Sequence, residues 1–170
     1  CSVGVVKTLL LQQNSMMKVL VVGKCRARIH RFVPVADLPI PLQQRLSVEP
    51  IFVEVEELSP IDDIGADAAT NPQLLELQES FESYARLSRR VHLEVPSSVA
   101  QIEDPSRRAD VIAGYVPLKP QDMQTLLAEL RVSKRLRLLR HLIEQECEQL
   151  RMQRKVRGRF RQPAGTSIQT

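Results

Sequence analysis

The chain has 170 residues, of which 43% are hydrophobic and 4% aromatic, and its formal net charge at pH 7 is +4. This length suits one domain or a small pair of subdomains, and the apolar fraction supports a core built mainly from aliphatic side chains. No run of about 18 apolar residues occurs, so we expect neither a membrane-spanning segment nor a membrane partner.

Two apolar runs separated by a short polar turn open the chain. Val3 to Gln12 and Lys18 to Ile29 predict a β-hairpin, with Gly23 at a bulge or bend in its second strand. Apolar and charged residues alternate from Cys25 to Ile29, which predicts one buried face and one solvated face.

Prolines at positions 34, 39 and 41 then end the strand pattern, and a third strand is expected within Leu46 to Leu58. Its alternation of Phe, Val and Glu predicts an antiparallel strand near the edge of a sheet. Residues 1–60 are therefore expected to form a β subdomain.

A polar segment with Asp62, Asp63, Gly65 and Asp67 follows. Its spacing does not fit an EF-hand loop, which also needs a Glu at its twelfth position and a preceding helix. We therefore interpret residues 61–71 as an acidic linker.

The rest of the chain predicts a helical subdomain over residues 72–161. Asn71-Pro72 and Asp104-Pro105 each combine a capping side chain with a first-turn proline, Pro120 opens another helix, and Ser133 is expected to cap the last one. A short helix is also predicted at Val99 to Glu103. Apolar side chains recur at helical spacing along these helices: Leu74, Leu77, Phe81, Tyr84, Ala109, Ile112, Val116, Met123, Leu126, Leu127, Leu130, Leu136, Leu139, Ile143, Cys147 and Leu150.

The last helix, from about residue 134, continues after its apolar stripe fades at Leu150. Such a helix usually leaves its domain and meets another partner. Residues 162–170, which follow Gly158 and include Pro163, are expected to be a disordered tail.

Basic residues gather without any acid at the end of that helix and are candidate contacts for an anionic partner such as a nucleic acid. They are Arg151, Arg154, Lys155, Arg157, Arg159 and Arg161. The alternative is a solvated helix end whose cations complement the helix dipole. No aromatic platform accompanies the cluster.

No catalytic, cofactor-binding or metal-binding residues are predicted. The three histidines lie in separate elements, no Cys or His pair has metal-ligand spacing, and neither a phosphate-binding glycine loop nor a nucleophile elbow is present. The cysteines, Cys1, Cys25 and Cys147, are odd in number and far apart, which favours free thiols in a reducing compartment and a cytoplasmic location.

An ordered set of segments resembles the N-terminal, substrate-recognition domain of the Lon ATP-dependent protease family. The resemblance covers roughly residues 3 to 161 and rests on Val3-Gly4-Val5-Val6, Lys18-Val19-Leu20-Val21-Val22-Gly23, Arg26-Ala27-Arg28-Ile29, Ile102-Glu103-Asp104-Pro105, Ala109-Asp110-Val111-Ile112-Ala113, Val116-Pro117-Leu118-Lys119 and Val156-Arg157-Gly158-Arg159. Family members open with further strands and a helix that have no counterpart before Cys1, so we expect a piece or an incomplete copy of the domain.

The resemblance implies an α+β fold: a small antiparallel β barrel-like subdomain, then a helical bundle with a long exit helix. It implies recognition of unfolded or tagged proteins, with no catalysis by this chain. In the family, a hexameric ATPase ring, which uses ATP and Mg, and a Ser-Lys peptidase domain follow on the same polypeptide, and DNA binding also occurs.

Exposed apolar residues after the hairpin are the candidate contacts for protein substrates. They are Phe32, Val33, Val35 and Leu38. The alternative is that these side chains lie buried beneath the missing strands, since apolar residues are usually inside.

Overall fold

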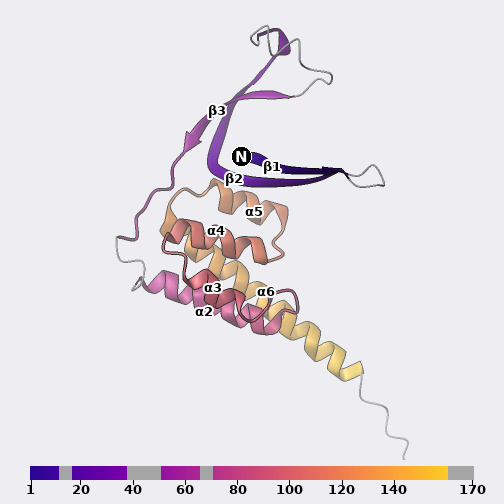
Figure 1. Ribbon diagram of the computed structural model, residues 1–170. Coiled ribbons are helices and arrows are strands. Elements are labelled where there is room, and N and C mark those ends of the chain that lie inside the picture. The colour runs from indigo at the N-terminus through magenta and orange to yellow at the C-terminus, as the bar shows by residue number, and fades with distance from the viewer. Residues whose placement is uncertain (12–16, 38–50, 66–70, 161–170) are drawn as a thin grey trace, which may run out of the picture. The chain divides into compact units, whose positions relative to one another are not determined.

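The computed structural model describes residues 1–11, 17–37, 51–65 and 71–160 (Figure 1). The chain divides into two compact units, Cys1–Pro60 and Ile61–Thr170. Strands make up the first unit and α-helices the second, so the predicted α+β class is confirmed. None of the described helices combines the length and the apolarity that crossing a bilayer requires.

The first unit, called the β unit here, holds one antiparallel sheet. Its strands stand in the order β1-β2-β3, with a short 3-10 turn after β2. Their bounds are β1 (Ser2–Leu11), β2 (Met17–Val33), η1 (Val35–Asp37) and β3 (Phe52–Leu58). The predicted hairpin and the third edge strand are confirmed, but the described sheet is open, whereas the resemblance implied barrel-like closure. Residues 46–50 of the predicted third strand lie outside the described residues.

The β1–β2 pair and the β2–β3 pair each contain irregular pairing, which bends the strands. Val3 pairs with Cys25 and Gly4 with Gly23, which leaves Lys24 as an extra residue and confirms the bulge predicted beside Gly23. A Cβ atom at Gly4 would lie 2.9 Å from Val21 Cγ1 and 3.0 Å from the carbonyl oxygen of Val22. A side chain at position 4 would therefore clash with the paired strand, so glycine fits this position.

The β unit buries little apolar surface. Among its described residues, Ala27 is a buried hydrophobic side chain, whereas Leu20 is 56% exposed and Ile29 44% exposed. Of the predicted buried face, Ala27 is buried and Cys25 is partly buried, but Ile29 is exposed, so the prediction is wrong at Ile29. A sheet buries a face only where a second layer covers it, and no α-helix occurs among the described residues of this unit.

The second unit, called the helical unit here, contains five described α-helices. They are α2 (Pro72–Leu87), α3 (Val95–Ala100), α4 (Pro105–Tyr115), α5 (Pro120–Ala128) and α6 (Val132–Phe160). Proline stands at the first or second position of the first four, where its missing N–H costs nothing. The predicted helix at Val99 to Glu103 both begins and ends earlier, at Val95 and Ala100, and Pro96 occupies its first turn.

Two of the predicted caps are confirmed by their hydrogen bonds. The Asn71 side chain accepts from the backbone N–H groups of Gln73 at 3.0 Å and Leu74 at 3.3 Å. The Asp104 carboxylate accepts from the N–H of Ser106 at 2.9 Å. Each contact satisfies a donor that the first helical turn leaves without an intrahelical partner.

The core of the helical unit is built from the predicted apolar stripes, and α2 packs chiefly against α6. The buried hydrophobic residues are Leu74, Leu77, Phe81, Tyr84, Ala85, Val91, Val99, Ala109, Ile112, Val116, Leu126, Val132, Leu136, Leu139, Leu142, Ile143 and Cys147. Of the other stripe members, Met123 is 49% exposed and Leu150 is partly buried. This core, unlike the β unit, is large enough to fix a single packing arrangement.

The start of α6 is capped by a residue that lies far away in the sequence. Asp63 accepts hydrogen bonds from the N–H of Ser133 at 2.8 Å and from its hydroxyl at 2.7 Å. The segment before Asp63 is fixed as well, because the Ile61 N–H donates to the carbonyl of Leu130 and the Ile61 carbonyl accepts from the N–H of Val132. Residues 61–63 of the predicted linker thus belong to the helical unit, and Ser133 lies inside the helix and is not its cap.

Replacing Asp63 with alanine is expected to cost the helical unit about 1 kcal/mol of stability, the usual effect of losing an N-cap acceptor. The hydrogen bonds from Ser133 lower the pKa of Asp63, so this stabilisation is present above the ordinary carboxyl pKa and is lost as the pH falls through the lower, folded value. Urea unfolding between pH 2 and pH 7 should show a weaker pH dependence for Asp63→Ala than for the parent chain.

Ser133→Ala provides the matching control for this prediction. The double variant should lose less stability than the sum of the two single variants, because both remove the same hydrogen bond between side chains. Strict additivity would show that the contact does not contribute to stability.

Candidate functional site

The predicted substrate-contact residues lie around the end of β2. Phe32 is 68% exposed, Val33 is partly buried opposite Phe52, and Val35 is partly buried in η1. Leu38 lies outside the described residues. Phe32 is therefore exposed at the surface of the described residues.

The register between β2 and β3 gathers apolar side chains on one face. Ile29 pairs with Val55 and Phe32 with Val53, and directly paired residues point to the same side of a sheet. Simple alternation from Ile29 would place Phe32 on the opposite face. The irregularity between Ile29 and Arg31 makes His30 an extra residue and returns Phe32 to the side of Ile29.

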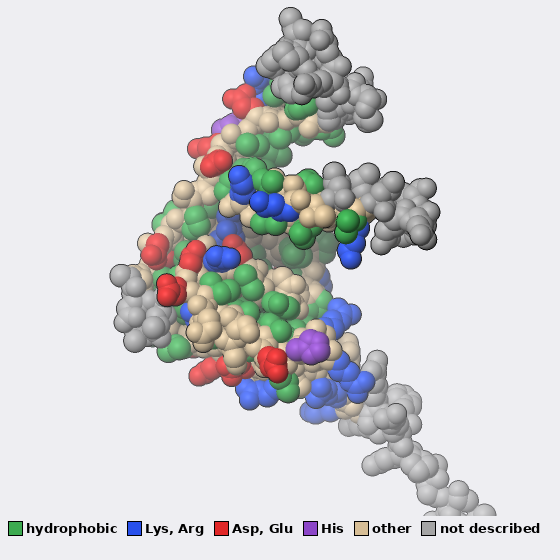
Figure 2. All heavy atoms as spheres, in the orientation of Figure 1, with side chains coloured by type: hydrophobic (Ala, Val, Ile, Leu, Met, Phe, Trp, Pro, Cys, Tyr) green, Lys and Arg blue, Asp and Glu red, His purple; other side chains and the backbone are tan. Residues whose placement is uncertain are grey.

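We call this set of four residues, Ile29, Phe32, Val53 and Val55, the apolar strip. Their exposed fractions are 44%, 68%, 37% and 37%, and Figure 2 shows hydrophobic side chains at the surface of the strands. A contiguous group of exposed apolar side chains is a typical site for binding another apolar surface.

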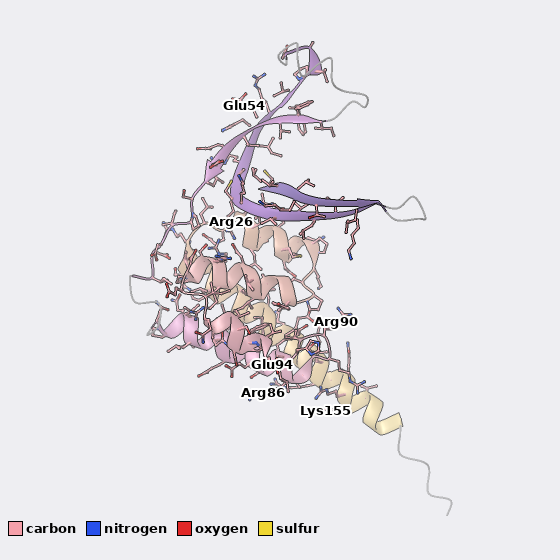
Figure 3. The ribbon with its side chains drawn as sticks, in the orientation of Figure 1. Arg26, Glu54, Arg86, Arg90, Glu94 and Lys155 are labelled. Carbon is pink, nitrogen blue, oxygen red and sulfur yellow. The ribbon has the colours of Figure 1, made fainter. Side chains whose placement is uncertain are left out.

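The opposite face of the same two strands is charged. Arg31 pairs with Glu54 at 2.7 Å, and Arg28 pairs with Glu56 at 3.3 Å. Glu54 is labelled on β3 in Figure 3. These exposed ion pairs contribute little to stability, but they make this face favour water, so the two faces of the β2–β3 ribbon differ in chemistry.

The predicted basic cluster is partly described. Arg151, Arg154 and Lys155 are exposed on α6, the side chains of Arg157 and Arg159 are not described, and Arg161 lies outside the described residues. Arg154 donates a hydrogen bond of 2.6 Å to the carbonyl of Leu87 at the end of α2. This bond holds the exposed part of α6 against the end of α2. The chain there carries Arg86, Arg89 and Arg90, which were not part of the predicted basic cluster.

Neither the metal-ligand types of side chain nor the buried thiol supports a reactive site within the described residues. No group of three His, Cys, Asp or Glu residues suited to a metal ion occurs in the described parts of the chain. Cys147 is buried on α6, and burial raises the pKa of its thiol, which keeps it protonated and poorly nucleophilic.

Comparison with known sequences connects this architecture to one family. Residues 1–145 match the family described as the ATP-dependent protease La (LON) substrate-binding domain. The chain belongs to the Lon substrate-binding domain family. The predicted resemblance is thereby confirmed.

Curated relatives of this Lon substrate-binding domain carry the name Lon protease. The protein of Brevibacillus choshinensis is 31% identical over 160 residues, which are 94% of this chain and 19% of the relative. The protein of Desulforamulus reducens is 32% identical over 161 residues, and that of Escherichia coli K12 is 37% identical over 81 residues. The matched region spans about a fifth of the length of the first two relatives and 10% of the Escherichia coli protein.

Sequence reasoning identified Phe32 but missed its neighbours in the Lon substrate-binding domain. The register of β2 with β3 places Ile29, Val53 and Val55 beside Phe32, and the bulge at His30 determines the face on which Phe32 lies. A signal was present, because Val53 and Val55 alternate with Glu54 and Glu56 and so share one face of the strand.

Proposed function

We propose that this Lon substrate-binding domain recognises unfolded, damaged or tagged proteins and delivers them to ATPase and Ser-Lys peptidase domains of a whole Lon-like protease. This chain then contributes binding and no catalysis, and ATP and Mg bind to the ATPase domain outside it. The complete protein is an ATP-dependent serine endopeptidase that assembles as a hexamer in the cytoplasm.

The apolar strip is the observation that best supports this function. Phe32 and its three neighbours expose aliphatic and aromatic surface on one face of the β2–β3 ribbon, which has a charged opposite face. Folded proteins bury such surface, and unfolded ones offer it, so burial of apolar area favours unfolded partners over native ones. The free thiols Cys1, Cys25 and Cys147 agree with a reducing compartment.

Phe32→Asp is expected to weaken binding of an unfolded protein by about tenfold or more, because a buried phenylalanine contributes roughly 1.5–3 kcal/mol to an apolar contact. The ligand is a small secreted protein that has been reduced and carboxymethylated so that it cannot refold. Its binding to the chain is followed by fluorescence anisotropy of a label on the ligand.

Thr8→Asp is the matched control, since Thr8 is also an exposed strand residue and the change in charge is the same. It should bind as the parent chain does, and Phe32→Leu should retain most of the affinity. Equal affinities of Phe32→Asp and the parent chain would remove Phe32 from the contact surface.

A further inference from the structure

A groove lies in the helical unit, on elements other than the strands to which substrate contact has been assigned. It has a volume of about 490 Å³ and is walled by apolar side chains of α3 and α4 and the segment between them. The lining apolar residues are Val95, Val99, Ile102, Val111 and Tyr115. His92, Glu94 and Ser98 supply its polar atoms. We call this feature the α3–α4 groove; its size suits one or two side chains of a ligand.

Cations lie next to the α3–α4 groove. Arg90 precedes the lining residue His92 by two positions, and Arg89 precedes it by three. The backbone of Arg90 therefore lies within about 8 Å of the backbone of His92. The hydrogen bond from Arg154 to Leu87 brings the exposed part of α6 to the end of α2, from which the segment with Arg89 and Arg90 continues. Figure 2 shows Lys and Arg side chains gathered over this end of α6, and Figure 3 shows Arg86, Arg90 and Lys155 around the ends of α2 and α6.

Most of these cations lack a local counter-charge. Arg86 pairs with Glu82 at 3.5 Å, and Glu94 lines the groove. Arg151 lies among Glu79, Glu144 and Glu148. Within the described residues, no ion pair forms at the other four cations, which we call the basic rim: Arg89, Arg90, Arg154 and Lys155. A surface with such an excess of positive charge attracts acidic groups of a partner.

We propose that the α3–α4 groove binds one apolar side chain of a polypeptide whose neighbouring residues are acidic and contact the basic rim. The inference deepens the proposed function, on which it rests, by naming a second site and the class of sequence it selects. Burial of the apolar side chain supplies affinity, and the rim selects against basic flanking residues.

A nucleic acid, the partner predicted from the basic cluster alone, fits this surface less well. Sequence-tolerant binding of single strands uses aromatic side chains on which bases stack. The rings that line the groove are those of Tyr115 and the single imidazole of His92, and the Tyr115 ring already lies against Phe81 with the ring centroids 6.0 Å apart. The remaining apolar walls are branched aliphatic side chains, which complement a leucine-like group better than a polar base edge.

The test uses fluorescein-labelled pentapeptides and the complete chain. The main probe has a central leucine flanked on each side by two glutamates; one comparison probe has serine in place of leucine, and another has lysines in place of the glutamates. A labelled single-stranded oligonucleotide is the fourth probe. We expect the leucine–glutamate peptide to bind about tenfold or more tightly than each of the other two peptides.

Two variants separate the groove from the rim. Ser98→Trp fills the groove from an exposed position, with Ser98→Leu as a smaller filler should the tryptophan prevent folding. Arg89→Glu/Arg90→Glu reverses the rim, and Lys119→Glu/Lys134→Glu makes the same charge change at exposed helix starts elsewhere on the unit. Groove and rim variants should each lose about tenfold in peptide affinity, and the control should lose none.

Two results would overturn the inference. One is peptide binding that is indifferent to the central leucine or to groove filling. The other is an oligonucleotide that binds through the rim, unaffected by Ser98→Trp, while the peptide does not bind. In either case, Phe32-dependent binding of the carboxymethylated protein would leave the proposed function intact, and its absence would refute that function separately.

Discussion

Replacing Arg135 with alanine is expected to destabilise the helical unit by about 3 kcal/mol, because it removes the packing and the hydrogen bonds of a fully buried side chain. The Arg135 side chain is 1% exposed. Its Nη2 donates to the Ser106 hydroxyl at 2.6 Å, its Nη1 donates to the carbonyl of Glu129 at 3.4 Å, and its Nε lies 3.9 Å from the Asp110 carboxylate. Truncation leaves a cavity and a buried hydroxyl without its donor.

Urea unfolding measures the effect of Arg135→Ala, with Arg137→Ala as the control. Arg137 stands on the same helix and is exposed, so its loss should change the free energy of unfolding by less than about 0.5 kcal/mol. A loss below about 1 kcal/mol for Arg135→Ala would mean that the buried guanidinium contributes no more than a surface residue does.

Phe81→Ala is expected to cost the helical unit about 3–5 kcal/mol, the usual range for truncating a fully buried phenylalanine. The Phe81 side chain is 0% exposed on α2, in the core that α2 forms with α6, and its ring contacts that of Tyr115. Thermal unfolding followed by near-ultraviolet circular dichroism reports both the stability and the packing of the tyrosine rings.

Leu75→Ala controls for helix position and loss of apolar volume, because Leu75 is on α2 but 48% exposed. It should cost no more than about 1 kcal/mol. Equal losses for Phe81→Ala and Leu75→Ala would contradict the assignment of the core face of α2.

The helical core was largely predictable because local physics determines it. The side chains of Leu74, Leu77, Phe81 and Tyr84 recur at the helical period, and all four are buried. Asn71-Pro72 and Asp104-Pro105 are start signals whose capping hydrogen bonds reach only two or three residues along the chain. Periodicity and capping are determined by residues that lie close together in the chain, so they can be recognised from the sequence itself.

Features that depend on distant segments were not predictable in the same way. Asp63 caps α6 across 70 residues of sequence, and local reasoning placed Ser133 there because Ser is a common cap. The expected buried face from Cys25 to Ile29 assumed a covering layer, which alternation alone cannot supply.

The candidate sites show the same division between local and distant determinants. Phe32 was predicted from its sequence position, whereas the apolar strip depends on the register of β2 with β3 and on the bulge at His30. The α3–α4 groove was not predicted at all, since it combines residues of two helices and a connecting segment.

The central claim is that this domain distinguishes unfolded from folded proteins through exposed apolar surface. One small protein, labelled and presented to the chain both in its native form and after reduction and carboxymethylation, tests this claim most directly. The account predicts saturable binding of the carboxymethylated form and binding of the native form weaker by about tenfold or more. Equal affinity for both forms, or no binding of either, would contradict it.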